Sequence, residues 1–361
     1  GTMADVYVPG NWTIQEMIVD GVVTPLDPFV EASGFSLDPF LPATVRALRG
    51  FTDGKLYALP VAYQVHAIFY NPDMFDKAGL AYPPANGDYT WHDLRDWARI
   101  LTLDSQGNNA DSASFDPNSI KQWGFGTLTT WHIMYTWEYI QMAFGGGTMT
   151  YPDGAKCNIE HPDSIRALQF IQDMYYKDHS TIPPAVEQET SYANRFPTGE
   201  VAMADAGFWE IDIIKLTDPE FRFDVAALPK EKAGNANNLY VETWGIWSGA
   251  KDKDLAWKFI SFASTKGYIT GMRLAVPALK EKVTSDEFLK LPGNPPHTKE
   301  AFVDCMAWPL TLTSSAYGPK FWQLIGQDGL APALDAILLN QKPAAEAVAG
   351  MCAKVEALLA Q

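Results

Sequence analysis

The sequence predicts an α/β protein made of two lobes. A chain of 361 residues is too long for one ordinary hydrophobic core, so two compact units are expected. Hydrophobic residues make up 47% of the chain and charged residues 19%, which excludes a disordered or fibrous class. Short strands alternate with amphipathic helices, as they do in open, mostly parallel sheets. Two lobes imply a cleft between them.

Six short apolar segments are predicted as strands because Gly, Pro or Asp residues bound each of them. They cover residues 4–8, 56–59, 67–70, 201–204, 223–227 and 245–248. The first strand is followed by a loop, Pro9-Gly10-Asn11. Since α/β sheets place ligands beyond the carboxyl ends of their strands, this loop is a candidate ligand contact.

Periodic apolar residues predict the helices between these strands. The clearest helix covers residues 91–101 and is entered through Thr90, and a second covers 163–176 after Pro162. A third is predicted over 252–263, and the stretch 331–359 is predicted as two helices broken near Pro343. The segment 104–118 is polar and is expected to be an exposed loop.

The charge balance argues against nucleic acid as a partner. The chain carries 27 basic and 43 acidic residues, a net charge of −16, which repels phosphate backbones and anionic lipid surfaces. It also lacks a run of about 18 apolar residues, the length that a membrane-spanning helix needs.

The three cysteines, Cys157, Cys305 and Cys352, have no C-x-x-C spacing. A zinc knuckle and a dithiol redox motif are therefore not supported, and no metal or cofactor is expected. A disulfide between Cys305 and Cys352 and three buried free thiols both remain open at this stage.

Several blocks in a fixed order carry a family resemblance. In chain order they are GKLYALP at 54–60, YNPDMFDKAGL at 70–80, YTW at 89–91, FPTGEVAM at 196–203, GFW at 207–209, LP at 228–229, WGI at 244–246 and LAWKFI at 255–260. Together they resemble the family 1 extracellular solute-binding proteins of ABC importers, the group that includes binders of maltose and other sugars.

The resemblance implies a type II periplasmic-binding-protein fold, the Venus flytrap, whose chain crosses between the lobes three times. The first lobe would hold residues 1–72 plus 250–308, and the second 73–249 plus 309–361. The block GTMADV at 1–6 is similar to the middle of the family's G-T-x-P-D-V block. The family's opening strand, helix and second strand would therefore lie upstream, in residues omitted from this chain or cleaved from it.

The resemblance also implies a function. The protein would be a monomer, exported to the periplasm or the extracellular space, and its precursor could carry a lipid anchor. It would trap a mono- or oligosaccharide by hinge closure, without changing it chemically, and deliver it to the transmembrane subunits of an ABC permease.

Three other functions remain open. The same fold could bind a polyamine, an amino acid or a sugar phosphate, or the chain could be an adhesion module without a small ligand. A carbohydrate-active hydrolase would need a carboxyl pair, such as Glu187 with Glu189 or Glu210 with Asp212. Solvated loop or helix faces explain these pairs better, since such residues are seldom buried. The motifs G-x-S-x-G, H-E-x-x-H and G-x-x-x-x-G-K-[ST] are absent.

A sugar is held by aromatic rings against its C–H face and by polar groups around its rim. Trp91, Trp97 and Trp257 stand at helical positions and are assigned to packing. The aromatic candidates stand in loops or at strand ends instead: Trp12, Trp131, Trp209, Trp244 and Trp308. The polar candidates stand near strand ends or crossovers: Asn11, Gln64, His66, Asp205, Glu242 and Arg273.

Overall fold

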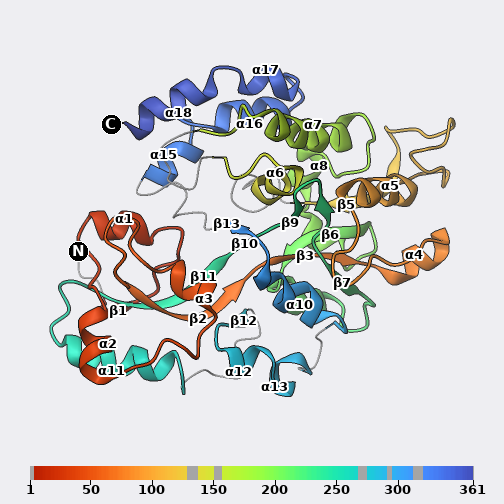
Figure 1. Ribbon diagram of the computed structural model, residues 1–361. Helices are drawn as coiled ribbons and strands as arrows, with labels where there is room; N and C mark the ends of the chain where they lie inside the picture. The colour runs from red at the N-terminus through yellow and green to blue at the C-terminus, as the bar shows by residue number, and fades with distance from the viewer. Residues whose placement is uncertain are drawn as a thin grey trace.

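The strands of the protein form two main sheets. The computed structural model describes residues 4–127, 137–149, 157–266, 275–290, 295–311 and 320–360. Within them, a four-stranded sheet has the order β1 (Val6–Tyr7), β11 (Tyr240–Ile246), β2 (Ala58–Gln64), β12 (Val276–Pro277). A five-stranded sheet has the order β4 (Leu103–Asp104), β5 (Ile120–Gly126), β6 (Val201–Gly207), β3 (His66–Tyr70), β7 (Asp224–Ala227). The two sheets lie side by side along the molecule (Figure 1).

The sheets are mainly antiparallel, so the prediction of mostly parallel sheets was wrong. In the described residues, β5 and β6 are the parallel pair of the five-stranded sheet. By contrast, β3 pairs antiparallel with both β6 and β7, and β2 pairs antiparallel with β11 and β12. The alternation of strands and helices misleads here because the chain leaves one sheet for the other between strands. A strand therefore often pairs with one that is distant in sequence.

Helices surround both sheets. Around the four-stranded sheet lie α1 (Ile14–Val19), α2 (Asp27–Ser33), α3 (Pro42–Arg46), α11 (Lys253–Ala263), α12 (Lys280–Val283) and α13 (Asp286–Leu289). The five-stranded sheet is interleaved in the chain with α4 (Pro72–Ala78), α5 (Trp91–Leu101), α6 (Glu138–Phe144), α7 (Pro162–Tyr176), α8 (Pro184–Glu189), α9 (Tyr192–Arg195) and α10 (Glu210–Thr217). A π-helical turn η2 (Lys299–Val303) and a 3-10 turn η3 (Asp304–Ala307) precede the last crossover.

Local chemistry sets the ends of the best-predicted helix, α5. The Asp93 backbone N–H donates to Thr90 Oγ1 at 3.0 Å, and the Thr90 N–H donates to Asp93 Oδ2 at 2.7 Å. This reciprocal capping box satisfies backbone donors at the helix start. The predicted range 91–101 is confirmed, as are α7 after its N-terminal Pro162 and α11 after its cap Asp252.

The C-terminal stretch forms more helices than predicted. After α15 (Phe321–Ile325), it contains α16 (Ala331–Leu338), α17 (Ala344–Val348) and α18 (Met351–Leu359). The second break falls at Gly350, whose φ of 78° is left-handed and ends the helical run. In Figure 1 α16 and α17, in blue, lie beside α7 at the top of the molecule, and α18 and α15 lie to their left.

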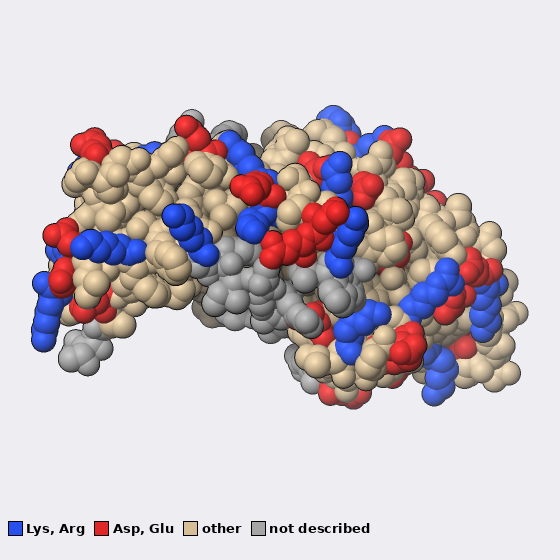
Figure 2. All heavy atoms as spheres, turned by 90° about the horizontal axis from the view of Figure 1, so that it is seen from below, with Lys and Arg blue, Asp and Glu red and all other residues tan. Residues whose placement is uncertain are grey.

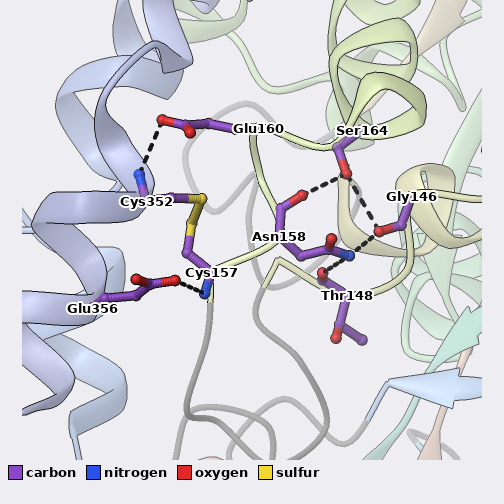
Figure 3. Close-up of a disulfide and its surroundings, with 8 residues drawn as sticks. All are labelled: Gly146, Thr148, Cys157, Asn158, Glu160, Ser164, Cys352 and Glu356. Carbon is purple, nitrogen blue, oxygen red and sulfur yellow. Dashed lines mark hydrogen bonds between the residues drawn. A yellow bond between two sulfur atoms is a disulfide. The ribbon is translucent and has the colours of Figure 1, made fainter.

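A disulfide ties the last helix, α18, to the segment that precedes α7. Cys352 in α18 is bonded to Cys157, with a Cα–Cα distance of 4.9 Å (Figure 3). The Cys157 N–H donates to Glu356 and the Cys352 N–H donates to Glu160, at 3.3 and 3.2 Å. The suggested Cys305–Cys352 bond is thus wrong, because Cys305 is fully buried in the other hydrophobic cluster.

The hydrophobic interior consists of two large clusters that meet at the five-stranded sheet. Alternate residues of β3 enter different clusters: Ile68 and Tyr70 face α5, α6, α7 and the C-terminal helices, whereas Ala67 and Phe69 face the cluster that continues into the four-stranded sheet. Every residue of β2, β3 and β6 is buried. These strands are therefore the rigid frame of the molecule.

Strand pairing moves two of the predicted lobe boundaries. β3 lies within the predicted first segment, 1–72, yet it pairs with β6 and β7 in the five-stranded sheet. β11 lies within 73–249, yet it pairs with β1 and β2 in the other sheet. The chain thus changes sheet at Val65 and again between β7 and β11. The assignment of the remaining ranges to lobes stays a prediction.

Charged side chains of both signs are mixed over the surface. On the face seen in Figure 2, Lys and Arg side chains alternate with Asp and Glu at both ends of the molecule. Many form ion pairs, such as Lys282 with Glu287 at 2.9 Å and Lys290 with Asp286 at 2.7 Å. None of the helices in the described ranges combines the length and the apolar character needed to cross a membrane.

Candidate ligand-binding site

Three chain crossings between the sheets come together around Asn237, which is fully buried. The His66 N–H donates to Asn237 Oδ1 at 3.0 Å, and Asn237 Nδ2 donates to the His66 carbonyl at 2.8 Å. The Asn237 N–H in turn donates to the Pro309 carbonyl at 3.2 Å. One asparagine therefore joins the crossing at Val65, the crossing before β11 and the one at Pro309. Asn237 itself belongs to β10 (Asn237–Asn238), which pairs in parallel with β13 (Leu310–Thr311).

Asn11 reinforces this joint. Its Nδ2 donates to the Leu239 carbonyl at 2.9 Å, and the Val241 N–H donates to its Oδ1 at 3.0 Å. Asn11 was predicted as a ligand contact, but both polar atoms of its amide are hydrogen-bonded to the backbone that leads into β11.

His66 and Asp205 lie in contact at the end of the five-stranded sheet beside the first crossing. His66 Nδ1 is 2.7 Å from Asp205 Oδ1, and both side chains are fully buried. This contact brings an imidazole nitrogen and a carboxylate oxygen within hydrogen-bond distance. The other carboxylate oxygen accepts from Thr127 Oγ1 at 3.2 Å and from the Tyr139 hydroxyl. Neither Thr127 nor Tyr139 is among the residues predicted from sequence, although Thr127 follows directly on the strand β5.

Trp209 stands next to this pair and is half-buried. Its ring meets the His66 ring edge-on, with 5.5 Å between centroids, and its Nε1 donates to Glu210 Oε1 at 2.9 Å. A Cβ on Gly207 would come within 1.8 Å of the indole, so the ring lies directly against this glycine. Among the described residues, Trp209 packs into neither hydrophobic cluster.

Glu210 was interpreted from sequence as part of a solvated face, and that interpretation was wrong. Its side chain is 7% exposed, whereas Asp212, two residues on, is half-exposed. Burial raises the pKa of Glu210, while the hydrogen bond from Trp209 and the nearby His66 act in the opposite direction. We call His66, Thr127, Tyr139, Asp205, Trp209 and Glu210 the junction cluster.

A second group of predicted and neighbouring residues, Trp12, Gln64 and Tyr240, lies on the other side of the crossing at Val65. The Trp12 ring meets the Tyr240 ring edge-on at 6.1 Å, and Tyr240 pairs with Gln64 across β11 and β2. The Tyr240 hydroxyl accepts from Asn238 Nδ2 at 3.0 Å. Gln64 is buried and immediately precedes Val65 and His66, so the two groups adjoin along the chain.

The remaining predicted residues are more scattered. Trp244 packs edge-on against Phe259 of α11, 5.6 Å between centroids, and burial raises the pKa of Glu242 on the same strand. Trp308 packs against both hydrophobic clusters at the third crossing. Trp131 and Arg273 lie outside the described residues.

A surface hollow of about 480 Å³ lies away from these residues, between α5, α7 and β8 (Lys230–Glu231). The cationic side chains that line this hollow form ion pairs: Arg95 pairs with Asp178, and both Arg166 and Lys232 pair with Asp163. None of the predicted site residues lines it. Within the described ranges, no group of three or more His, Cys, Asp or Glu side chains could hold a metal ion.

Comparison with known proteins places the chain in a family. A model of the bacterial extracellular solute-binding proteins matches residues 1–269. A putative binding protein of Brucella abortus (strain 2308) is 27% identical over 373 residues, covering 99% of this chain and 80% of that protein.

Solved structures of low sequence identity share the fold. An ABC substrate-binding protein of Listeria monocytogenes, in complex with cycloalternan, superposes with a TM-score of 0.82 at 21% identity, over 100% of this chain and 86% of that one. UgpB of Mycobacterium tuberculosis, in complex with glycerophosphocholine, gives 0.78 at 20% identity, over 100% and 85%. The predicted two-lobed, type II periplasmic-binding-protein fold is confirmed. Since the family model covers well over half of its length, the chain belongs to the bacterial extracellular solute-binding proteins.

Proposed function

We propose that this protein captures a neutral carbohydrate at the junction of its two lobes and delivers it to the permease of an ABC importer. The observation that carries the proposal is Trp209: a half-buried indole outside both hydrophobic clusters, held between His66 and Glu210 beside the first crossing. A flat ring bordered by hydrogen-bonding groups suits the C–H face and hydroxyl rim of a sugar.

The charge of the junction cluster favours a neutral ligand over a sugar phosphate. The cluster contains the carboxyl groups of Asp205 and Glu210 and no Lys or Arg. A phosphate brought beside these buried acids would meet further acceptor groups and no cation of the cluster, and Asp205 already engages His66, Thr127 and Tyr139. The Listeria protein with cycloalternan is accordingly the better guide to ligand chemistry than UgpB with glycerophosphocholine.

A polyamine is the second candidate, because a buried carboxyl beside an aromatic ring also suits an ammonium group. Glu210 is the residue that favours it, since its carboxyl is buried and accepts one hydrogen bond, from Trp209.

The proposed mechanism is hinge closure. A ligand that contacts both lobes binds the closed form more tightly and shifts the population toward it. The joint at Asn237 is where the lobes would rotate, since the three crossings meet there. Binding requires no covalent step, and we therefore propose no enzymatic activity.

The cellular setting follows from the family, whose members are normally exported. We propose a periplasmic or extracellular monomer, with lipid anchoring of the precursor as one route of retention. The Cys157–Cys352 disulfide fits an oxidising compartment.

The test is a thermal-shift screen followed by calorimetry. The panel contains neutral mono- and oligosaccharides, a hexose phosphate and spermidine, each at constant pH and ionic strength. We expect a neutral sugar to raise the melting temperature, since a ligand at 100 times its Kd stabilises by about 2.7 kcal/mol. A shift with spermidine alone would favour the polyamine, and a shift with hexose phosphate alone would overturn the charge argument.

A further inference from the structure

Glu210 is a buried acid with an unusual hydrogen-bond arrangement. One carboxylate oxygen, Oε1, accepts from Trp209 Nε1 at 2.9 Å. The other, Oε2, is shielded from solvent and has no hydrogen-bond partner among the described residues. Burying a carboxyl group carries a desolvation penalty that hydrogen bonds normally offset. Among the described residues, the Glu210 side chain therefore forms one hydrogen bond, with the indole N–H of Trp209.

The indole is confined on two further sides. The His66 ring stands edge-on to it at 5.5 Å, and His66 is itself fixed by Asp205. On another side, Gly207 leaves no room for a Cβ, which would lie 1.8 Å from the Cζ3 atom of the ring. Three independent contacts thus set the orientation of a ring that does not belong to either hydrophobic cluster.

A core role does not explain this confinement. A tryptophan that only fills a core is oriented by the apolar side chains around it, and its N–H needs any convenient acceptor. At this position the adjacent residue supplies a buried carboxyl group, although a neutral acceptor would avoid the desolvation penalty. The hydrogen bond from the indole N–H to Glu210 Oε1 is directional, so it restricts the orientation of the ring in a way that apolar packing alone does not.

We propose that Glu210 is the positioning residue of the binding site: it locks the indole of Trp209 in the orientation that receives the ligand. The proposal rests on the proposed function, since it assigns Trp209 to ligand binding. Pre-orienting the ring reduces the entropy lost when the ligand orders it, so affinity depends on the bond between Glu210 and Trp209. Glu210 itself need not touch the ligand.

The experiment compares two variants with a matched control. Glu210→Gln keeps an acceptor for the indole N–H, whereas Glu210→Met keeps the length of the side chain and removes the acceptor. The control, Asp212→Asn, removes a half-exposed carboxyl from the same first turn of α10. It corrects for any general effect of charge at the start of this helix.

Two readouts are measured. The first is the Kd of the sugar selected by the screen, by calorimetry. We expect Glu210→Met to weaken binding about tenfold, and Glu210→Gln and Asp212→Asn to stay within about threefold of the parent protein. The second is the ¹⁹F resonance of Trp209 in ligand-free protein labelled with 5-fluorotryptophan, assigned by its loss in Trp209→Phe. It should move or broaden in Glu210→Met and stay in place in the other two variants.

The ¹⁹F resonance of Trp209 is measured without ligand, so it tests the contact between Glu210 and Trp209 independently of the proposed function. If the parent protein binds no sugar, the function is wrong, yet the resonance still reports whether Glu210 holds the ring. An unchanged resonance and an unchanged Kd in Glu210→Met would overturn the inference. Equal losses in Glu210→Met and Glu210→Gln would overturn it too, because charge rather than the hydrogen bond would then matter. If Glu210→Met does not fold, Gly207→Ala displaces the same ring by steric contact and should reproduce its effects.

Discussion

Asp205 shows how single residues build the junction. One oxygen of its side chain contacts His66 Nδ1, and the other accepts hydrogen bonds from Thr127 and Tyr139. Three chain segments therefore meet at Asp205. A fully buried carboxylate is tolerated only when donors replace the water it has lost. The same bonds fix the His66 ring and, through it, one side of Trp209.

Replacing Asp205 should therefore affect both stability and binding. In Asp205→Asn, an amide N–H₂ faces groups that donate, and we expect the free energy of unfolding to fall by about 3 kcal/mol. Thr127→Val removes one of the three donors and should lower it by about 1 kcal/mol. Urea unfolding measures both values. An Asp205→Asn protein as stable as the parent would show that the carboxylate is not the centre of the network.

At the scale of elements, α18 depends on its covalent link. Val355 is the fully buried residue of this helix, and Met351, Cys352, Leu358 and Leu359 pack, partly buried, against the same hydrophobic cluster. The disulfide adds a covalent link to this packing by joining Cys352 to Cys157 across 195 residues of sequence. Long closed loops are the ones whose cross-links restrict the unfolded chain most.

Loss of this disulfide should destabilise the protein by about 2 to 5 kcal/mol. The comparison is between the parent, a Cys157→Ser and Cys352→Ser double variant, and Cys305→Ala, each unfolded in urea with and without reductant. Reductant should lower the midpoint of the parent and of Cys305→Ala and leave the double variant unchanged. Insensitivity of the parent to reductant under unfolding conditions would contradict the assigned pairing.

At the scale of the whole molecule, the two lobes are joined through a small set of buried amides. Asn237 bonds to the backbone of His66 on one crossing and of Pro309 on another. Because His66 also contacts Asp205, the joint and the junction cluster share one residue. Movement of the lobes and occupation of the site are therefore expected to influence each other.

Asn237→Ala should lower the free energy of unfolding by about 2 to 4 kcal/mol, since it leaves the buried N–H and C=O of His66 without their partner. Small-angle X-ray scattering measures the radius of gyration with and without ligand. Asn237→Ala should change either the radius of the ligand-free protein or the decrease in radius on ligand binding. Asn235→Ala is the matched control: Asn235 donates to the Gly87 and Leu228 carbonyls at 2.9 Å, and these bonds do not involve His66 or Pro309. Identical scattering of Asn237→Ala and the control, with and without ligand, would count against Asn237 as the hinge.

The sequence by itself determined the features that depend on near neighbours along the chain. The capping box at Thr90, the proline at the start of α7 and the apolar spacing of α11 are local, so these helices were predicted within a residue or two. The two-lobed α/β class followed from length and from strand and helix alternation, and the ordered blocks pointed to the family.

Only the tertiary structure decided which distant segments meet. Antiparallel pairing, the partner of Cys352, the contact of His66 with Asp205 across 139 residues and the burial of Glu210 all depend on segments that are distant in sequence. Local spacing cannot encode such contacts. Which donor faces which acceptor depends on the register that two strands adopt after they have been brought together, and burial depends on everything that packs around them.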